Sequence, residues 1–441
     1  MKRRNSDYFI GMVYGSGANR KYSKRRRKRQ RQLILRRGLL IALCCILLLG
    51  LGAVTYFCIV PAVSNLFGSK GSAPATADEA TTDEIIVQVT TTTESITEAP
   101  TEAPTTMPTT TQAPTTEPTT IAPTEPEPVS PEDFISPVVK DDGKDGTLYS
   151  STLYLWKNKG FNLFGSTDKV AKNYATTLNG IVKKLDKKVT VYNMVVPNHT
   201  EFGLPQRIKT EIGCTSQADN IKTINKNLAD RIKSINCYNA LATHNDEYIY
   251  YNTDHHWTSL GAYYAYTAFC EQTGKTPLDI STLKKNSIEG FTGSFYTLSG
   301  SSSLYNNSDT VVYYTLPNKT SAQMKERMGS QTIYCDVYYP ASTSGSLTYG
   351  VFCWGDTAQF KINSDAGTGK KIAVVKDSYG NAFAPFLTAH YDEIHLIDYR
   401  YYSGDLNSYL KQNGIDEVLF LNNTMSANSA SQVAGMKNAL S

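Results

Sequence analysis

Near its C-terminus the chain contains the apolar run Lys371-Ile372-Ala373-Val374-Val375-Lys376, and two further short apolar runs follow at residues 393–397 and 418–421. Helical segments are expected between these runs, near 381–389 and 405–413. Short apolar runs that alternate with helices are typical of parallel strands in a sheet covered by helices on both faces. We therefore predict an α/β domain built around a parallel sheet.

The same alternation continues upstream of these runs. Residues 188–197 form a mostly apolar run that ends at a proline, which predicts a buried strand. Apolar residues at helical spacing predict helices over 221–235 and 261–273. Residues 277–369 are instead rich in Tyr, Ser and Gly, which predicts antiparallel strands joined by turns. The predicted domain thus spans residues 135–441 and contains a β-rich insertion at about 277–369.

The N-terminal part of the chain has a different composition. Residues 1–37 carry fourteen Lys and Arg against one acidic residue, and residues 38–60 are 23 uncharged, mainly apolar residues. A helix of that length crosses a hydrocarbon core of about 30 Å. Because the positive charges precede it, we expect a basic cytoplasmic tail, a single-pass transmembrane helix and an extracytoplasmic C-terminal domain. The alternative is a cleaved signal peptide, whose apolar region is usually shorter.

Residues 69–133 are crowded with Thr, Pro, Ala and Glu, and they carry twelve acidic residues against one lysine. Such a segment has too little apolar surface to fold, so we predict a disordered stalk between the cell membrane and the external domain. The basic tail alone could suggest a nucleic-acid-binding protein, but the apolar segment that follows argues against that class. Five cysteines lie in the external domain, and bridges between Cys335 and Cys353 or between Cys214 and Cys237 are both open.

Two segments combine the residue types that nucleophilic catalysis needs. Asp254, His255 and His256 precede the helix predicted from residue 261. An Asp two positions before a His on a tight loop can orient the imidazole as a general base. Ser378 follows a predicted strand at a strand-to-helix turn, where a serine is exposed at the sheet edge and backbone N–H groups can bind an oxyanion. We therefore predict that Ser378, His256 and Asp254 converge.

Each segment also has a simpler interpretation. Asp377 and Ser378 could merely cap the following helix. The adjacent histidines could bind a metal with Asp254, although the H-E-x-x-H pattern is absent, and we expect no metal. His390 and His395 lie beside a predicted strand and are expected to be structural.

The run Tyr250-x-x-Thr-Asp-His-His-Trp-Thr-x-x-Gly-Ala-x-x-Ala-Tyr266 is similar to the signature of the DHHW proteins of Gram-positive bacteria. These resemble the alginate O-acetylation proteins of the SGNH-hydrolase-like superfamily. The resemblance implies a three-layer α/β/α fold and a triad of Ser378, His256 and Asp254. The Gly and Asn blocks of the usual oxyanion hole are not recognisable. Candidates for oxyanion or substrate binding, beside the Ser378 backbone N–H, are Arg400, Asn422, Asn423, Trp257 and Tyr379.

The resemblance further implies O-acetylation of a cell-surface polysaccharide, with no cofactor. Acetyl-CoA is absent outside the cell, so the expected acyl donor is a multi-pass membrane-bound O-acyltransferase. Two alternatives remain at this point. The same triad would remove acetyl groups if water were the acceptor, and a non-catalytic protein that binds the cell wall could keep the fold.

Overall fold

The computed structural model describes residues 133–325, 331–339 and 345–440. The predicted tail, the transmembrane helix and the stalk up to residue 132 lie outside this part, and they stay predictions. Within the described ranges, no helix combines the length and the apolar character needed to cross a membrane.

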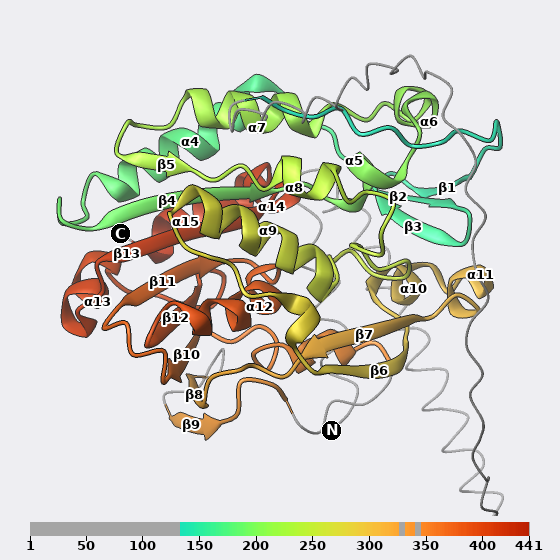
Figure 1. Cartoon of the computed structure of the whole chain (residues 1–441). Helices are drawn as coiled ribbons and strands as arrows, with labels where there is room; N and C mark the ends of the chain where they lie inside the picture. Colours follow the sequence, from blue (N-terminus) through green and yellow to red (C-terminus); the bar gives the residue numbers. More distant parts are fainter. Residues whose placement is uncertain (1–132, 326–330, 340–344, 441) are drawn as a thin grey trace, which may run out of the picture. The chain divides into compact units, whose positions relative to one another are not determined.

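An eight-stranded mixed sheet forms the centre of the domain (Figure 1). Five neighbouring strands are parallel, in the order β5 (Ile232–Ser234), β4 (Thr190–Val196), β13 (Glu417–Asn423), β11 (Lys371–Lys376) and β12 (Glu393–Asp398). Three antiparallel strands extend the sheet beyond β12: β10 (Gln359–Ser364), β8 (Thr320–Lys325) and β9 (Thr332–Cys335). The predicted strands at 188–197, 371–376, 393–397 and 418–421 are therefore present, but the sheet is mixed rather than wholly parallel.

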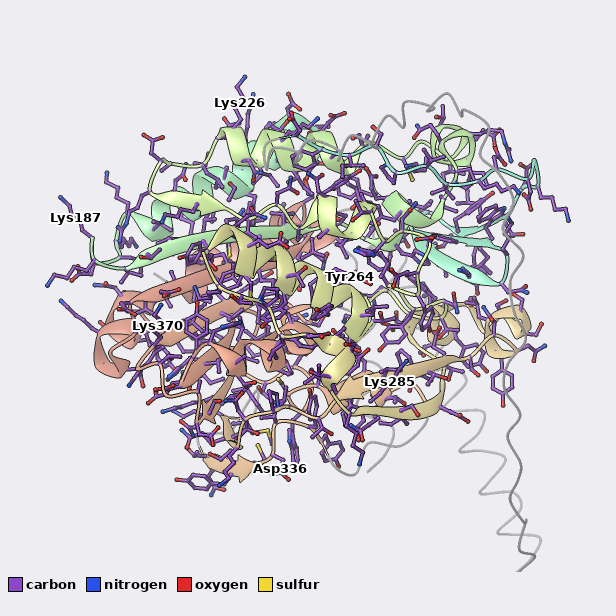
Figure 2. All side chains as sticks on the ribbon, in the orientation of Figure 1. Lys187, Lys226, Tyr264, Lys285, Asp336 and Lys370 are labelled. Carbon is purple, nitrogen blue, oxygen red and sulfur yellow. The ribbon has the colours of Figure 1, made fainter. Side chains whose placement is uncertain are left out.

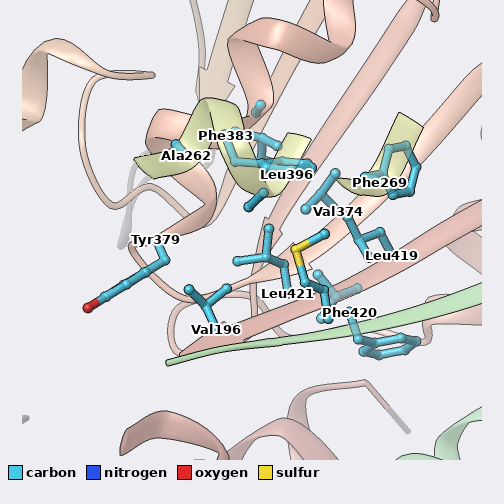
Figure 3. Packing of buried hydrophobic residues seen from close by; sticks show 14 of the residues in the cluster. Val196, Ala262, Phe269, Val374, Tyr379, Phe383, Leu396, Leu419, Phe420 and Leu421 are labelled. Atoms are coloured by element: carbon cyan, nitrogen blue, oxygen red, sulfur yellow. The ribbon is translucent and has the colours of Figure 1, made fainter. Parts of the chain in front are cut away.

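Helices cover both faces of the parallel strands. On β4, Asn193 accepts a hydrogen bond from Tyr174 of α4 (Asp168–Val182), whereas the neighbouring Tyr192 packs edge-on against Phe269 of α9 (Ser259–Gln272). Adjacent strand residues point to opposite faces, so α4 and α9 lie on opposite sides of the sheet. Figure 3 shows Phe269 beside Val374 and Leu419, and Phe383 beside Leu396. The domain is thus a mixed α/β fold with a large sheet between helical layers.

In the described part of the chain, nine further helices precede, follow or connect the strands of this sheet. They are α5 (His199–Gly203), α6 (Gln206–Glu211), α7 (Gln217–Lys226), α8 (Tyr238–Ala242), α12 (Gly380–Phe383), η4 (Ala384–Ala389), α13 (Leu406–Asn413), α14 (Thr424–Ala427) and α15 (Ala430–Ala439). Many lysine side chains project from the periphery, as Lys187 and Lys226 show in Figure 2.

Two predicted helices differ from the structure. The helix predicted over 221–235 ends at Lys226, because the chain turns after Asn227 and residues 232–234 pair with β4 as strand β5. The apolar residues at helical spacing were therefore shared between a helix and a strand. The helix predicted near 381–389 is a four-residue α-helix followed by the 3-10 helix η4, which has a proline in its first turn. The predicted helix at 405–413 is present as α13, capped by Asp405.

The segment 277–369 is closely joined to the sheet. After η2 (Ile280–Thr282), strands β6 (Lys285–Phe291) and β7 (Asp309–Tyr314) form an antiparallel pair, with α10 (Ser294–Ser299) and α11 (Ser302–Tyr305) between them. The segment then supplies β8, β9, the 3-10 turn η3 (Thr348–Val351) and β10. Near the N-terminus of the domain, β1 (Thr147–Ser150), β2 (Leu153–Trp156) and β3 (Lys159–Asn162) form a small separate sheet. All five cysteines of the domain are free thiols.

Candidate active site

The structure brings Ser378, His256 and Asp254 into one hydrogen-bonded chain. Ser378 lies two residues beyond the C-terminal end of β11, and the other two residues lie in the loop before α9. The Ser378 Oγ is 2.7 Å from His256 Nε2, and His256 Nδ1 is 2.5 Å from Asp254 Oδ1. All three side chains are buried. A base with one nitrogen on the serine and the other on a carboxylate is arranged to remove the serine proton.

Backbone donors fix the Asp254 carboxylate. Its Oδ1 also accepts from the His256 N–H at 2.9 Å, and its Oδ2 accepts from the Ser294 N–H at 2.7 Å. Burial alone would raise the pKa of Asp254, but His255, His256 and these hydrogen bonds lower it below its usual range. The carboxylate therefore stays ionised and can hold His256 in one tautomer.

A second buried carboxylate, Asp309 of β7, holds the chain just before Asp254. Its oxygens accept from the Asn252 N–H and the Thr253 N–H, each at 2.8 Å, and from the Thr253 hydroxyl at 2.5 Å. The Gly293 N–H in turn donates to the Thr253 hydroxyl at 2.9 Å. The insertion thus supports the catalytic loop through Asp309, Gly293 and Ser294.

Trp257 and Tyr379 connect the histidine loop to the serine loop. The Trp257 Nε1 donates to the Tyr379 carbonyl at 3.1 Å, and the Tyr379 hydroxyl donates to the His255 carbonyl at 2.5 Å. Trp257 is 0% exposed and Tyr379 is 1% exposed. Both rings are therefore enclosed, and a substrate-binding role for Trp257 or Tyr379 stays a prediction. Their hydrogen bonds hold the two loops together.

The two asparagines that end β13 also have structural roles. The Asn423 N–H and Nδ2 both donate to Asp377 Oδ2 at 2.8 Å, and Asn422 Nδ2 donates to the Tyr174 hydroxyl at 3.1 Å. Burial raises the pKa of Asp377. The Nδ2 groups of both residues are engaged by these partners, and an oxyanion role for Asn422 or Asn423 stays a prediction. Asn423 holds the residue before the serine.

Arg400 belongs to a buried charge cluster. Its Nε and Nη2 donate to the two Asp398 oxygens at 2.8 and 2.6 Å, and Nη2 is 3.0 Å from Asp356 Oδ2. The Lys376 Nζ is 2.9 Å from Asp398 Oδ2 and 3.6 Å from Asp356 Oδ1. Two carboxylates thus balance two cations next to the serine loop. A role for Arg400 in oxyanion binding stays a prediction.

His255 lies beside His256. Its Nδ1 is 2.7 Å from the Ser294 hydroxyl, and its ring centre is 3.9 Å from that of His256. Burial, followed by the charge of His256, lowers the pKa of His255 to about 4. Donor atoms of Asp254, His255 and His256 lie within 4.8 Å of one another, the spacing of a metal site. However, both His256 nitrogens are engaged by Asp254 and Ser378, so a metal at this point would displace the hydrogen-bonded chain.

The other two histidines named above have partners in the core. The His390 Nε2 lies 2.7 Å from the Tyr266 hydroxyl, and the His395 Nδ1 lies 2.9 Å from the Tyr409 hydroxyl. Both are remote in sequence from the loop of Asp254 and serve the packing of helices against the sheet.

A family model described as DHHW protein matches residues 132–397, which include Asp254, His256 and Ser378. The chain belongs to the DHHW family. The resemblance inferred from the signature is thereby confirmed. A solved DHHW family protein from Eubacterium siraeum is 33% identical, covers 67% of this chain and 98% of its own, and superposes with a TM-score of 0.61.

PatB1 of Bacillus cereus shares the fold of this DHHW domain. It is 22% identical, with a TM-score of 0.54, over 64% of this chain and 98% of PatB1. A second PatB1 structure, which carries a sulfonyl adduct, is 20% identical, also with a TM-score of 0.54, over 66% of this chain and all of that one. None of the curated proteins compared with the chain matches it.

Sequence reasoning missed four residues that shape the site: Gly293, Ser294, Asp309 and Tyr349. They are common residue types in a Tyr-, Ser- and Gly-rich segment, with no motif around them. Only the pairing of β6 with β7 and the position of η3 bring them to the catalytic loop.

Proposed function

We propose that this DHHW protein is a membrane-anchored, extracytoplasmic O-acyltransferase that acetylates a cell-surface polysaccharide through an acyl-enzyme on Ser378. The observation that carries the proposal is the continuous chain from Ser378 through His256 to Asp254. A serine needs a neighbouring base to become a nucleophile at neutral pH, and the base needs an orienting group.

The chemistry follows from these contacts. Ser378 Oγ attacks the carbonyl carbon of an acetyl donor while its proton passes to His256 Nε2. The donor oxygen leaves as an alcohol after it takes that proton, and the acetyl group stays on Ser378. A sugar hydroxyl then attacks the acetyl carbon and gives its proton to His256 Nε2. The bond from that carbon to Ser378 Oγ breaks, Ser378 Oγ takes the proton back from His256, and the acetate ester of the sugar is released. Asp254 stabilises the imidazolium in both steps.

The burial of the triad supports transfer rather than hydrolysis. Ser378 is 6% exposed and His256 is 2% exposed, so little water reaches the serine. Exclusion of water protects an acyl intermediate until an acceptor hydroxyl arrives. The expected donor partner is a multi-pass membrane-bound O-acyltransferase, because an external domain has no supply of acetyl-CoA. The anchor and stalk predicted from residues 1–133 would hold the domain near such a partner.

The proposal is tested with full-length protein in detergent and a nitrophenyl acetate as donor, with and without surface polysaccharide. Ser378→Ala should remove nearly all release of nitrophenol, whereas the exposed Ser431→Ala on α15 should leave it unchanged. If Ser378→Ala folds normally and keeps wild-type turnover, the assignment is wrong and a non-catalytic wall-binding protein becomes the better interpretation. If the donor is consumed but the polysaccharide never gains acetyl groups, the protein is an esterase.

A further inference from the structure

One aromatic side chain contacts both the base and the nucleophile loop. The ring of Tyr349, in η3, is stacked on the His256 imidazole, with ring centres 3.8 Å apart and an interplanar angle of 8°. Its hydroxyl donates to the Ser378 carbonyl at 3.1 Å. Tyr349 is buried. Among the described rings, His255 lies almost as close to His256, at 3.9 Å, but is tilted by 37°, and Tyr379 is 5.6 Å away at 47°.

The interaction between the Tyr349 ring and the His256 imidazole changes during the proposed reaction, because the charge of the imidazole changes. The imidazole is neutral before Ser378 loses its proton and becomes a cation when it accepts that proton. The face of an aromatic ring carries negative charge density and attracts a cation, and the attraction is strongest where water is excluded. A contact that strengthens as the imidazolium forms lowers the barrier rather than merely stabilising the resting site.

The hydroxyl has a separate effect. The Ser378 carbonyl accepts from the Tyr349 hydroxyl and from the Asn381 N–H at 3.2 Å, which fixes the backbone of the nucleophile. Burial raises the pKa of Tyr349 well above its usual value, so the hydroxyl keeps its proton and remains a donor at neutral pH.

We infer that Tyr349 is a positioning residue for acyl transfer: its ring stabilises protonated His256, and its hydroxyl holds the backbone of Ser378. This inference rests on the proposed function of the triad. The simpler alternative is that Tyr349 only fills the core, where it also packs against Tyr251 and Phe352.

The test uses variants of the full-length protein. Tyr349→Phe keeps the stack and removes the hydroxyl, and Tyr349→Leu removes both. Phe352→Leu is the matched control, because Phe352 lies three residues away, is also buried, and packs on Tyr349. Fluorinated phenylalanines placed at position 349 keep the ring's shape but withdraw electron density from its face. Ser378→Ala is measured in parallel.

Tyr349→Leu should lower kcat/KM by about 3- to 30-fold, the range of a desolvated cation–π contact. The acidic limb of its pH profile should move to lower pH by up to about one unit, because the imidazolium loses its partner. Tyr349→Phe should leave the acidic limb of the pH profile in place and lower kcat/KM only a few-fold. Increasing fluorination of the ring at position 349 should lower kcat/KM progressively. It should also move the acidic limb of the pH profile to lower pH, as Tyr349→Leu does. The other groups around the imidazole, Asp254, His255 and Tyr379, are present in every variant.

A core-filling role predicts a different pattern. If fluorination has no effect on rate or limb, or if Phe352→Leu reproduces the whole effect of Tyr349→Leu, the inference is overturned even if Tyr349→Leu folds poorly. Should Ser378→Ala abolish turnover while every Tyr349 variant behaves as wild type, only this inference fails. Should Ser378→Ala stay active, the proposed function fails first.

Discussion

Replacing Gly293 with alanine should disable the site with little effect on the rest of the fold. A Cβ at position 293 would lie 2.2 Å from Asp254 Cβ and 2.5 Å from Asp254 Oδ2. The backbone of Gly293 has a φ of −81°, which alanine adopts without strain, so the contact is the whole perturbation. To reach an ordinary van der Waals distance of 3.4 Å, the Asp254 side chain and residue 293 must separate by about 1 Å.

Such a shift moves the carboxylate that orients His256. A misplacement of about 1 Å in a catalytic array lowers the rate by about 100-fold. Overpacking a buried position lowers the free energy of unfolding by about 1 to 3 kcal/mol. We therefore expect Gly293→Ala to retain about 1% of wild-type kcat/KM on a nitrophenyl acetate, with a lower but still cooperative melting transition.

Gly435→Ala is the matched control, because a Cβ at position 435 of α15 meets no atom within 4 Å. Its activity should equal that of the wild type, and its stability should be equal or slightly higher, since alanine favours a helix. If Gly293→Ala stays within about three-fold of wild-type activity while folded, the close packing of Gly293 on Asp254 has no catalytic importance.

Three further predictions concern stability and topology. Burial lowers the pKa of His199 to about 3 and that of His395 to about 4, so the unfolded chain binds protons near pH 6.5 that the folded domain does not. The free energy of unfolding should therefore be highest above about pH 6.5 and fall as the pH drops toward 4. Urea midpoints that stay constant over this pH range would contradict the prediction. Asp398→Asn should cost about 3 to 5 kcal/mol, because it leaves Lys376 and Arg400 short of a buried counter-charge; a loss below about 1 kcal/mol in urea unfolding would show that the cluster adds little. Protease added to intact protoplasts should digest the domain that follows residue 133, and full protection would show that the predicted orientation is wrong.

Four of the eight strands of the central sheet, β4, β11, β12 and β13, were predictable because their sequences are mostly apolar runs. Residues 372–376 and 418–421 are buried on both faces of the sheet. Strands buried on both faces have nearly continuous runs of Val, Ile and Leu, so the runs themselves indicated such strands. The helix predicted over 221–235 was wrong in its second half. The helical spacing there depended on Ile232 and Ile235, which are buried on the edge strand β5 and just beyond it. Apolar spacing over so few residues does not distinguish a helix from a short strand.

The site was predictable only where the residues lie within motifs. The signature around Asp254 and the strand-to-helix turn at Ser378 each pointed to the sheet edge, and the structure places both there. Asn422 and Asn423 illustrate the limit, because a position at a strand end does not say which face a side chain takes. Gly293, Asp309 and Tyr349 reach the loop only through tertiary pairing, so nothing in their local sequence marked them.

The central claim is that Ser378 carries an acyl group during the reaction. The most direct measurement is the mass of the protein, quenched during turnover of a nitrophenyl acetate, followed by peptide mapping of the modified residue. The account predicts one added acetyl group on Ser378, its disappearance when polysaccharide is supplied, and no adduct in His256→Ala. An acetyl group on another residue, or turnover with no adduct at Ser378 even when the second step is slowed, would contradict it.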